Sequence, residues 1–133
     1  MKRVSCISIL LFSCLVSMAQ TKKTTASGKD IYAKYCLTCH QQNGTGVPNL
    51  NPPLIKTSFV LGDKATLITW VHSGSAEEKV PIDGKYYNNN MPPQSFLKDE
   101  EMAAVLTYIR TNFGNKASVV TADDVKKVRA AIK

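Results

Sequence analysis

The feature that most constrains this chain is Cys36-Leu37-Thr38-Cys39-His40, a pair of cysteines three positions apart followed directly by a histidine. Cysteines at this spacing serve as a redox dithiol, as half of a zinc site, or as the two thioether attachment points of a haem. Only haem attachment has a fixed use for a histidine at the next position, where the imidazole reaches the iron. The motif therefore favours a covalently bound haem.

The two other chemistries suit the surrounding sequence less well. A thioredoxin-like site places its cysteines after a strand and before a helix, whereas here a helical pattern precedes the motif and a coil rich in proline and glycine follows it. A zinc site needs four ligands, and His72 would have to join Cys36, Cys39 and His40. Since Cys39 and His40 are adjacent, closing a tetrahedron is awkward. A thiol–disulfide oxidoreductase that uses Cys36 and Cys39 is kept as the distant alternative.

Residues 1–19 have the form of a secretory signal peptide. Lys2 and Arg3 precede an apolar run over residues 7–16, and Ser17-Met18-Ala19 provides a small-residue cleavage site. The run is shorter than the roughly 20 apolar residues of a membrane-spanning helix. We expect cleavage after Ala19 and export to the periplasm. The alternative is a lipoprotein signal that ends at Cys14 and would tether the protein to a membrane.

Cleavage after residue 19 would leave Cys36 and Cys39 as the only cysteines, in a compartment that oxidises idle thiols. A disulfide between them would close a very small loop and add little stability. The formal net charge is +7, and the lysines are scattered rather than clustered. This pattern argues against nucleic-acid binding. It suits transient docking to a redox protein with an acidic face, because opposite charges steer association.

Helical periodicity and capping residues predict an all-α fold of about three to five helices joined by long irregular loops. The first helix carries the Cys-x-x-Cys-His motif on its last turn, and the strongest apolar stripe lies between Asp99 and about Phe113. The predicted helices start after Ser27, after Asp63, at Asp99 and after Thr121.

Between the helices, prolines and glycines exclude regular structure over residues 41–57 and again around residues 88–94. In residues 79–88, Asp83-Gly84 separates β-prone residues and predicts a short β-hairpin. We divide the chain into a signal peptide (1–19), a flexible leader (20–26), one domain (27–114) and a C-terminal helical extension (115–133). Loops of this kind are expected to wrap a bound group.

The second iron ligand is expected to be Met91. Met102 lies on the apolar stripe of the long helix, where core packing explains it, whereas Met91 lies in the polar, helix-breaking stretch "NNNMPPQ". A thioether opposite a histidine raises the reduction potential and gives an electron-transfer site. The alternative ligand is His72, at the end of the second predicted helix. The predicted metal ligands are therefore His40 and Met91.

The chain resembles the class I, or mitochondrial-type, c-type cytochromes over roughly residues 27–114. This resemblance implies a small fold wrapped round a single haem c. It rests on Gly28, Tyr32, the Cys-x-x-Cys-His motif, "NGTGVPNLNPPL", Met91-Pro92-Pro93 and "VLTYIR".

The resemblance also implies several contacts. The His40 ring is expected to donate from Nδ1 to the Pro52 carbonyl, Leu54 is expected to pack on the haem, and the first and last helices should cross at right angles with Gly28 against Tyr108. The insertion at 79–88 resembles cytochrome domains that serve exported dehydrogenases or copper nitrite reductases.

The predicted function is a periplasmic one-electron carrier without enzymatic turnover, its iron cycling between ferric and ferrous states. We expect redox proteins as partners, no nucleic acid, no membrane span, and either a monomer or a subunit of an oxidoreductase complex. One alternative is the electron-accepting cytochrome subunit of an exported dehydrogenase or nitrite reductase. Another is a sensor or peroxidase-like haem protein whose sixth iron position is open.

Overall fold

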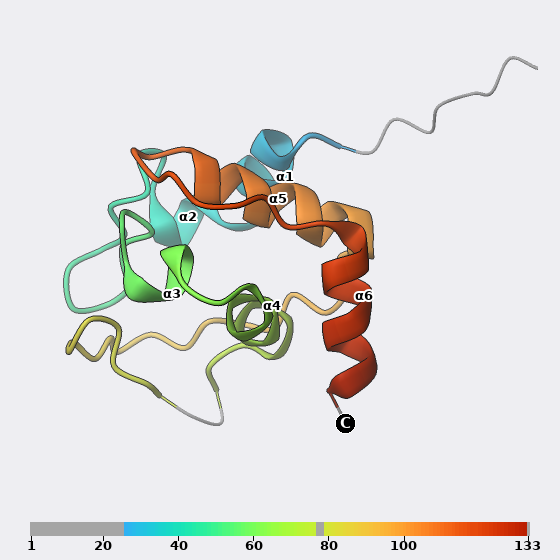
Figure 1. The fold of residues 1–133 in the computed structure, drawn as a ribbon. Coiled ribbons are helices and arrows are strands. Elements are labelled where there is room, and N and C mark those ends of the chain that lie inside the picture. The colour runs from blue at the N-terminus through green and yellow to red at the C-terminus, as the bar shows by residue number, and fades with distance from the viewer. Residues whose placement is uncertain (1–25, 77–78, 133) are drawn as a thin grey trace, which may run out of the picture.

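The computed structural model describes residues 26–76 and 79–132. These residues form helices and loops without a strand, so the predicted all-α fold is confirmed (Figure 1). Five helices lie within residues 27–114 and a sixth follows them. They are α1 (Gly28–Tyr35), α2 (Leu37–His40), α3 (Ser58–Leu61), α4 (Lys64–Ser73), α5 (Asp99–Thr111) and α6 (Ala122–Ala131). The predicted signal peptide, the lipidation alternative at Cys14 and nearly all of the leader lie outside the described residues.

Three of the predicted helix starts are capped as the sequence indicates. The side chains of Ser27, Asp63 and Thr121 each accept a hydrogen bond from the backbone N–H three residues later. Each bond satisfies one of the donors that the first turn of a helix leaves free. These short-range bonds fix where α1, α4 and α6 begin.

The prediction that the last turn of the first helix carries the Cys-x-x-Cys-His motif is wrong, because α1 ends at Tyr35. Cys36 lies between the two helices, and the rest of the motif forms the separate short helix α2. Cys36 has φ −111° and ψ −32°; its N–H donates to the Tyr32 carbonyl at the end of α1, and its carbonyl accepts from His40 N–H at the end of α2, both over 2.9 Å. Ile31 and Tyr32 of α1 are buried in the core, and the motif that follows borders a cavity.

Helices α1 and α5 pack closely because α1 begins with glycine. A Cβ atom on Gly28 would overlap the backbone carbonyl oxygen of Ala104 and would lie 2.8 Å from Cβ of Tyr108. The expected contact between Gly28 and Tyr108 is thus present. Next to it, the rings of Tyr32, Tyr108 and Phe113 form a cluster with centroids 5.2–5.6 Å apart.

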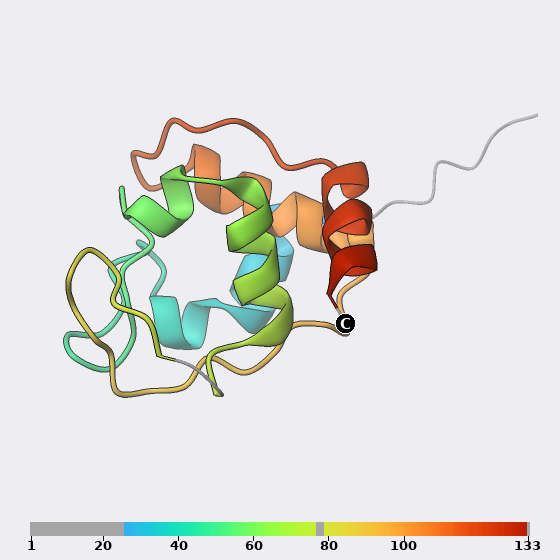
Figure 2. The ribbon, with the colours of Figure 1, turned by 60° about the horizontal axis from the view of Figure 1, so that its bottom comes forward.

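Helix α6 lies beside the first turn of α5 and against α4 in both ribbon views (Figures 1 and 2). Val125, on the inner face of α6, is fully buried. Two ion pairs join α6 to the rest of the protein, from Lys64 to Asp124 at 2.6 Å and from Arg129 to Asp99 at 2.8 Å. The segment after residue 114 therefore packs on the body of the domain.

The insertion at 79–88 forms less β-structure than predicted, only an isolated bridge between Ile82 and Lys85. The backbone beyond the bridge pairs elsewhere: Asn88 N–H donates to the carbonyl of Asn49 and Asn89 N–H to that of Leu50, over 2.9 and 3.0 Å. Since these donors bond to the 47–51 loop, they cannot extend a hairpin. Among the described residues, no helix combines the length and the apolar character needed to cross a bilayer.

Candidate haem-binding site

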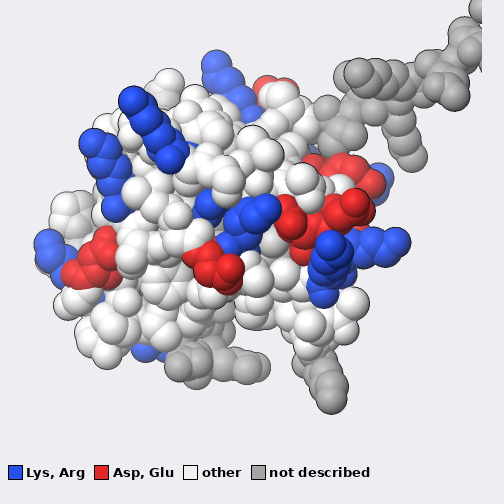
Figure 3. Space-filling view, viewed as in Figure 1, with Lys and Arg blue, Asp and Glu red and all other residues white. Residues whose placement is uncertain are grey.

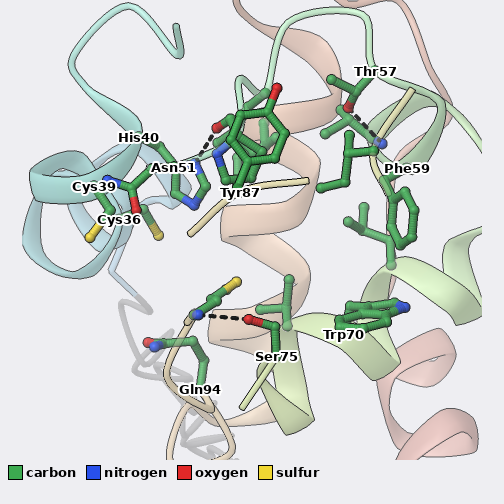
Figure 4. Close-up of a pocket in the computed structure, with 18 of the residues that line it drawn as sticks. Cys36, Cys39, His40, Asn51, Thr57, Phe59, Trp70, Ser75, Tyr87 and Gln94 are labelled. Atoms are coloured by element: carbon green, nitrogen blue, oxygen red, sulfur yellow. Dashed lines mark hydrogen bonds between the residues drawn. The ribbon is translucent and has the colours of Figure 1, made fainter. Parts of the chain in front are cut away.

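A mostly apolar cavity lies between the motif and the two helices α4 and α5 (Figure 4). Residues from α1 to α5 and from the connecting loops line it, whereas α6 contributes none. The walls include Val60, Leu67, Leu97, Val105, Leu106 and Ile109. Several of these side chains also belong to the main hydrophobic core, so the cavity is continuous with that core.

The motif supplies one wall of the cavity with Cys36, Cys39 and His40. Cys39 is exposed, Cys36 is partly buried, and the His40 side chain is almost fully buried. Burial, with a smaller contribution from the neighbouring Cys39, raises the pKa of the Cys36 thiol to about 11. At neutral pH this thiol is protonated, unlike the thiolate that a thiol–disulfide oxidoreductase uses for attack.

A hydrogen bond of 3.0 Å joins His40 Nδ1 to the carbonyl oxygen of Pro52. A carbonyl only accepts, so Nδ1 carries the proton and the lone pair of Nε2 is left free. Burial lowers the pKa of His40, although the bond to Pro52 opposes that shift. The ring is therefore held as neutral imidazole, the form that binds a metal.

The loop after the motif folds back beneath His40 through its own backbone. Gly46 N–H donates to the His40 carbonyl over 3.0 Å, and Leu54 N–H donates to the Gly44 carbonyl over 2.8 Å. These bonds place Pro52 beside the ring and bring both Pro52 and Leu54 to the cavity wall. Both residues that the family resemblance singled out in this loop thus border the same cavity as the motif.

Met91 lines the cavity as well, whereas His72 and Met102 do not. The Met91 N–H donates to Ser75 Oγ over 2.8 Å, the lower dashed bond in Figure 4. Met102 is fully buried in α5 as part of the hydrophobic core. His72 is partly buried, and the nearby charge of Arg129 adds to the effect of burial in lowering its pKa. Of Met91 and Met102, only Met91 lines the cavity that His40 also borders.

Sequence reasoning missed several residues that border the cavity. Ser75, Gln94 and Phe59 carried no pattern that marks a site, because their positions depend on how distant segments fold together. Trp70 and Tyr87 also line the cavity, whereas Tyr86 does not and is 65% exposed.

The donor set fits a haem of the c type. Two thiols can form thioether bonds, a neutral imidazole and a thioether are the usual axial ligands of electron-transfer haems, and the rest of the lining is mostly apolar. Among residues 26–76 and 79–132, no group of three or more His, Cys, Asp or Glu side chains is arranged to hold a metal ion by itself. Fold and site together define a small all-α protein of the c-type haem class.

Comparisons with known proteins agree. The sequence matches the cytochrome c family over residues 25–113, and the chain belongs to this family. Cytochrome c-552 of Thermus thermophilus is 40% identical over 114 residues, which span 79% of this chain and 86% of that protein. The cytochrome c subunit of the quinone alcohol dehydrogenase of Gluconobacter oxydans (strain 621H) is 32% identical over 112 residues, or 77% of this chain. The cytochrome subunit of fructose dehydrogenase of Gluconobacter japonicus is 27% identical over 116 residues, or 83% of this chain.

The two dehydrogenase subunits are much longer than this chain, which matches 22% and 23% of their lengths. The match to cytochrome c-552, by contrast, covers most of both proteins. The family assignment makes the chain a class I mono-haem c-type cytochrome, an electron-transfer protein that carries covalent haem c.

Proposed function

We propose that this protein is an exported carrier of single electrons whose haem is attached through Cys36 and Cys39 and whose iron is bound by His40 and Met91. The observation that carries the proposal is that these four side chains, from two distant parts of the sequence, line one apolar cavity. When bound, the haem supplies a ferric/ferrous couple, whose potential a thioether ligand raises.

Three residues have defined tasks at the histidine side. His40 presents Nε2 as the free nitrogen, and Pro52 holds the ring orientation by accepting from Nδ1. A bond of this kind fixes the tautomer and increases the basicity of the ligating nitrogen. Leu54 covers the cavity wall next to Pro52 with apolar surface. Burial of the ring and its bond to Pro52 therefore hold His40 in one orientation.

In this function the protein has no enzymatic turnover of its own. If His40 and Met91 both occupy axial positions, no iron position is left for a substrate. The sensor or peroxidase-like alternative requires that Met91 stay off the iron. Carbon monoxide binding by the reduced protein near neutral pH distinguishes the two, because complete and rapid binding would favour an open sixth position.

The partners we propose are redox proteins that present an acidic face. The formal charge of the chain is +7, and it falls to +5 when Lys2 and Arg3 are removed with residues 1–19. The face in Figure 3 shows basic and acidic side chains interspersed rather than a large basic field. Charges of this kind steer a transient encounter more than they add affinity. We expect residues 1–19 to direct export and then to be cleaved off. In the alternative, a lipid on Cys14 would tether the exported protein to a membrane.

A second candidate role is the electron-accepting cytochrome of a dehydrogenase complex. The observation that favours it is the similarity of this chain to a segment of the Gluconobacter dehydrogenase subunits. In that role the protein would receive electrons from one fixed partner instead of shuttling between two. Co-purification of a stable complex from the native host, rather than a free monomer, would support it.

The attachment proposal is tested by mass spectrometry and by haem staining of a denaturing gel. We expect the mature chain to start near Gln20, to carry the mass of one haem, and to keep its colour through acid–acetone extraction. Replacing both Cys36 and Cys39 by Ala should remove the stain, while the control Thr38→Ala, an exposed position between them in the motif, should keep it. A colourless protein with disulfide-reducing activity would instead support the thiol–disulfide reading, which the raised pKa of Cys36 already disfavours.

A further inference from the structure

Both backbone polar groups of Met91 are bonded to one residue at the end of α4. The Met91 N–H donates to Ser75 Oγ over 2.8 Å, and the Ser75 N–H donates to the Met91 carbonyl over 2.9 Å. Figure 4 shows Ser75 on the side of the cavity away from Cys36, Cys39 and His40. Met91 is therefore held at its backbone by a residue that the family resemblance did not mark.

The contact is close because the residue before Ser75 is glycine. Gly74 has φ +76°, and a Cβ atom there would lie 2.5 Å from the Met91 carbonyl oxygen and 2.8 Å from the Pro93 nitrogen. A side chain at this position would push the two segments apart. The end of α4 is thus shaped to let the Met91 segment approach it.

The same segment is bonded to α4 a second time, through Gln94. The Gln94 N–H donates to the Val71 carbonyl over 3.0 Å, and the Gln94 side chain, only 8% exposed, donates to the Pro92 carbonyl over 3.0 Å. Pro92 and Pro93 have no N–H. Between Met91 and Gln94, every backbone donor of the segment therefore bonds to the end of α4.

Helix α4 is itself anchored in the core. Ile68 is fully buried and Leu67 is 6% exposed, both in the main core. The segment on either side of Met91 has no regular secondary structure of its own. The core thus holds α4, and α4 in turn holds the otherwise unsupported Met91 segment.

We propose that Ser75 is a positioning residue, which fixes the place of the Met91 thioether by hydrogen bonding the Met91 backbone. This inference rests on the proposed ligation of iron by Met91 and deepens it. The hydroxyl bonds the backbone of the proposed ligand residue, so it acts by limiting how often Met91 leaves its position. Losing one such bond shifts a local equilibrium by about two- to tenfold.

The test compares Ser75→Val with Ser75→Thr in the haem-loaded, full-length protein. Valine and threonine have nearly the same shape, so the pair differs chiefly in the hydroxyl that accepts from Met91 N–H. Two signals are measured: the weak far-red charge-transfer band of the ferric protein, which reports an iron–thioether bond, and the rate of carbon monoxide binding to the ferrous protein. Ser73→Ala, an exposed hydroxyl two positions away, is the matched control.

We expect Ser75→Val to bind carbon monoxide about two- to tenfold faster than Ser75→Thr, with a weaker far-red band. Ser75→Thr and Ser73→Ala should behave like the unaltered protein. Equal rates and equal bands for the valine and threonine variants would overturn the positioning role. If Ser75→Val does not retain haem, the smaller Ser75→Ala takes its place, because alanine also lacks the hydroxyl that accepts from Met91 N–H. Carbon monoxide binding as slow in Ser75→Ala as in the unaltered protein would equally overturn the inference.

Met91→Ala separates this inference from the ligation on which it rests. If Met91→Ala leaves the far-red band unchanged, the ligand assignment itself is wrong. If Met91→Ala abolishes the band while the two Ser75 variants are identical, ligation stands and only the positioning role fails. The ligation and the positioning role can therefore fail separately.

Discussion

His40 and Pro52, twelve positions apart, are joined by a hydrogen bond of 3.0 Å from the ring Nδ1 to the backbone carbonyl. The acceptor is a main-chain atom, so the bond depends on the path of the loop and not on the proline side chain. The backbone bonds of Gly46 and Leu54 define that path. The orientation of the proposed ligand is thus built from loop geometry.

Pro52→Ala is accordingly expected to retain this bond. Alanine keeps the carbonyl, so the far-red band and the reduction potential should change little. The free energy of unfolding should fall by about 0.4–1 kcal/mol, since proline restricts the unfolded chain more than alanine does. Potentiometry and chemical unfolding of the same sample check both parts. A large drop in potential without unfolding would show that the proline ring itself matters.

Gly28→Ala is expected to destabilise the protein although alanine is the better helix former. The added methyl would overlap the Ala104 carbonyl, a backbone atom that cannot rotate away. Overpacking of this kind costs about 1–3 kcal/mol. Denaturant unfolding measures the change, with Lys29→Ala, an exposed substitution on the same helix, as control. Equal stability of the two variants would contradict close packing of α1 on α5.

The contrast between caps and long-range contacts explains what the sequence could predict. The starts of α4 and α6 were found because a cap and its partner are three residues apart. In the sequence, Arg110 is only a basic residue in the last turn of a predicted helix. In the structure it is 2% exposed and donates to the carbonyls of Val60, Gly62 and Ser118. No local pattern encodes which distant carbonyls a buried guanidinium will reach.

The residues of the proposed site fall into the same two groups, those that a local pattern marks and those that depend on contacts between distant segments. Cys36, Cys39 and His40 are readable because attachment chemistry fixes their spacing. Met91 was inferred because a methionine in a polar loop has no local reason to be there. The support given by Ser75 was not predictable, because it requires the end of α4 and the Met91 segment to meet, and neither stretch indicates the other.

Arg129→Ala should loosen α6 from the body of the protein. The guanidinium donates to the Asp99 carboxylate over 2.8 Å and to the Leu97 carbonyl over 2.6 Å, so its removal leaves both acceptors without this partner. We expect a loss of about 1–3 kcal/mol in the free energy of unfolding. Lys126→Ala, exposed on the same helix, should be neutral. Hydrogen exchange of α6 amides provides the direct readout, and unchanged protection would contradict the prediction.

The contact between α6 and α4 should weaken in strong acid. Hydrogen bonding from Lys64, followed by bonds from Thr121, lowers the pKa of Asp124 to about 2. A carboxyl whose folded pKa is depressed contributes its stabilisation above the unfolded pKa, near 4, and loses it as pH falls through the folded value. The contribution is therefore full above about pH 4 and lost towards pH 2. Unfolding measured between pH 5 and 2 should show a smaller acid-dependent loss for Asp124→Asn than for the unaltered protein; equal slopes would contradict the assignment.

Met91 and Met102 offer a comparison between a proposed ligand and a core residue of identical chemistry. Met91→Ala should abolish the far-red band, lower the reduction potential and open the iron to carbon monoxide, because the thioether that raises the potential is gone. Met102 is fully buried in α5, so Met102→Ala should cost about 2–5 kcal/mol of stability while leaving the band unchanged. Visible spectra, potentiometry and chemical unfolding on both variants separate the two effects. If Met91→Ala kept the band while Met102→Ala or His72→Ala altered it, the sixth ligand would have to be reassigned, even though haem attachment at Cys36 and Cys39 would be unaffected.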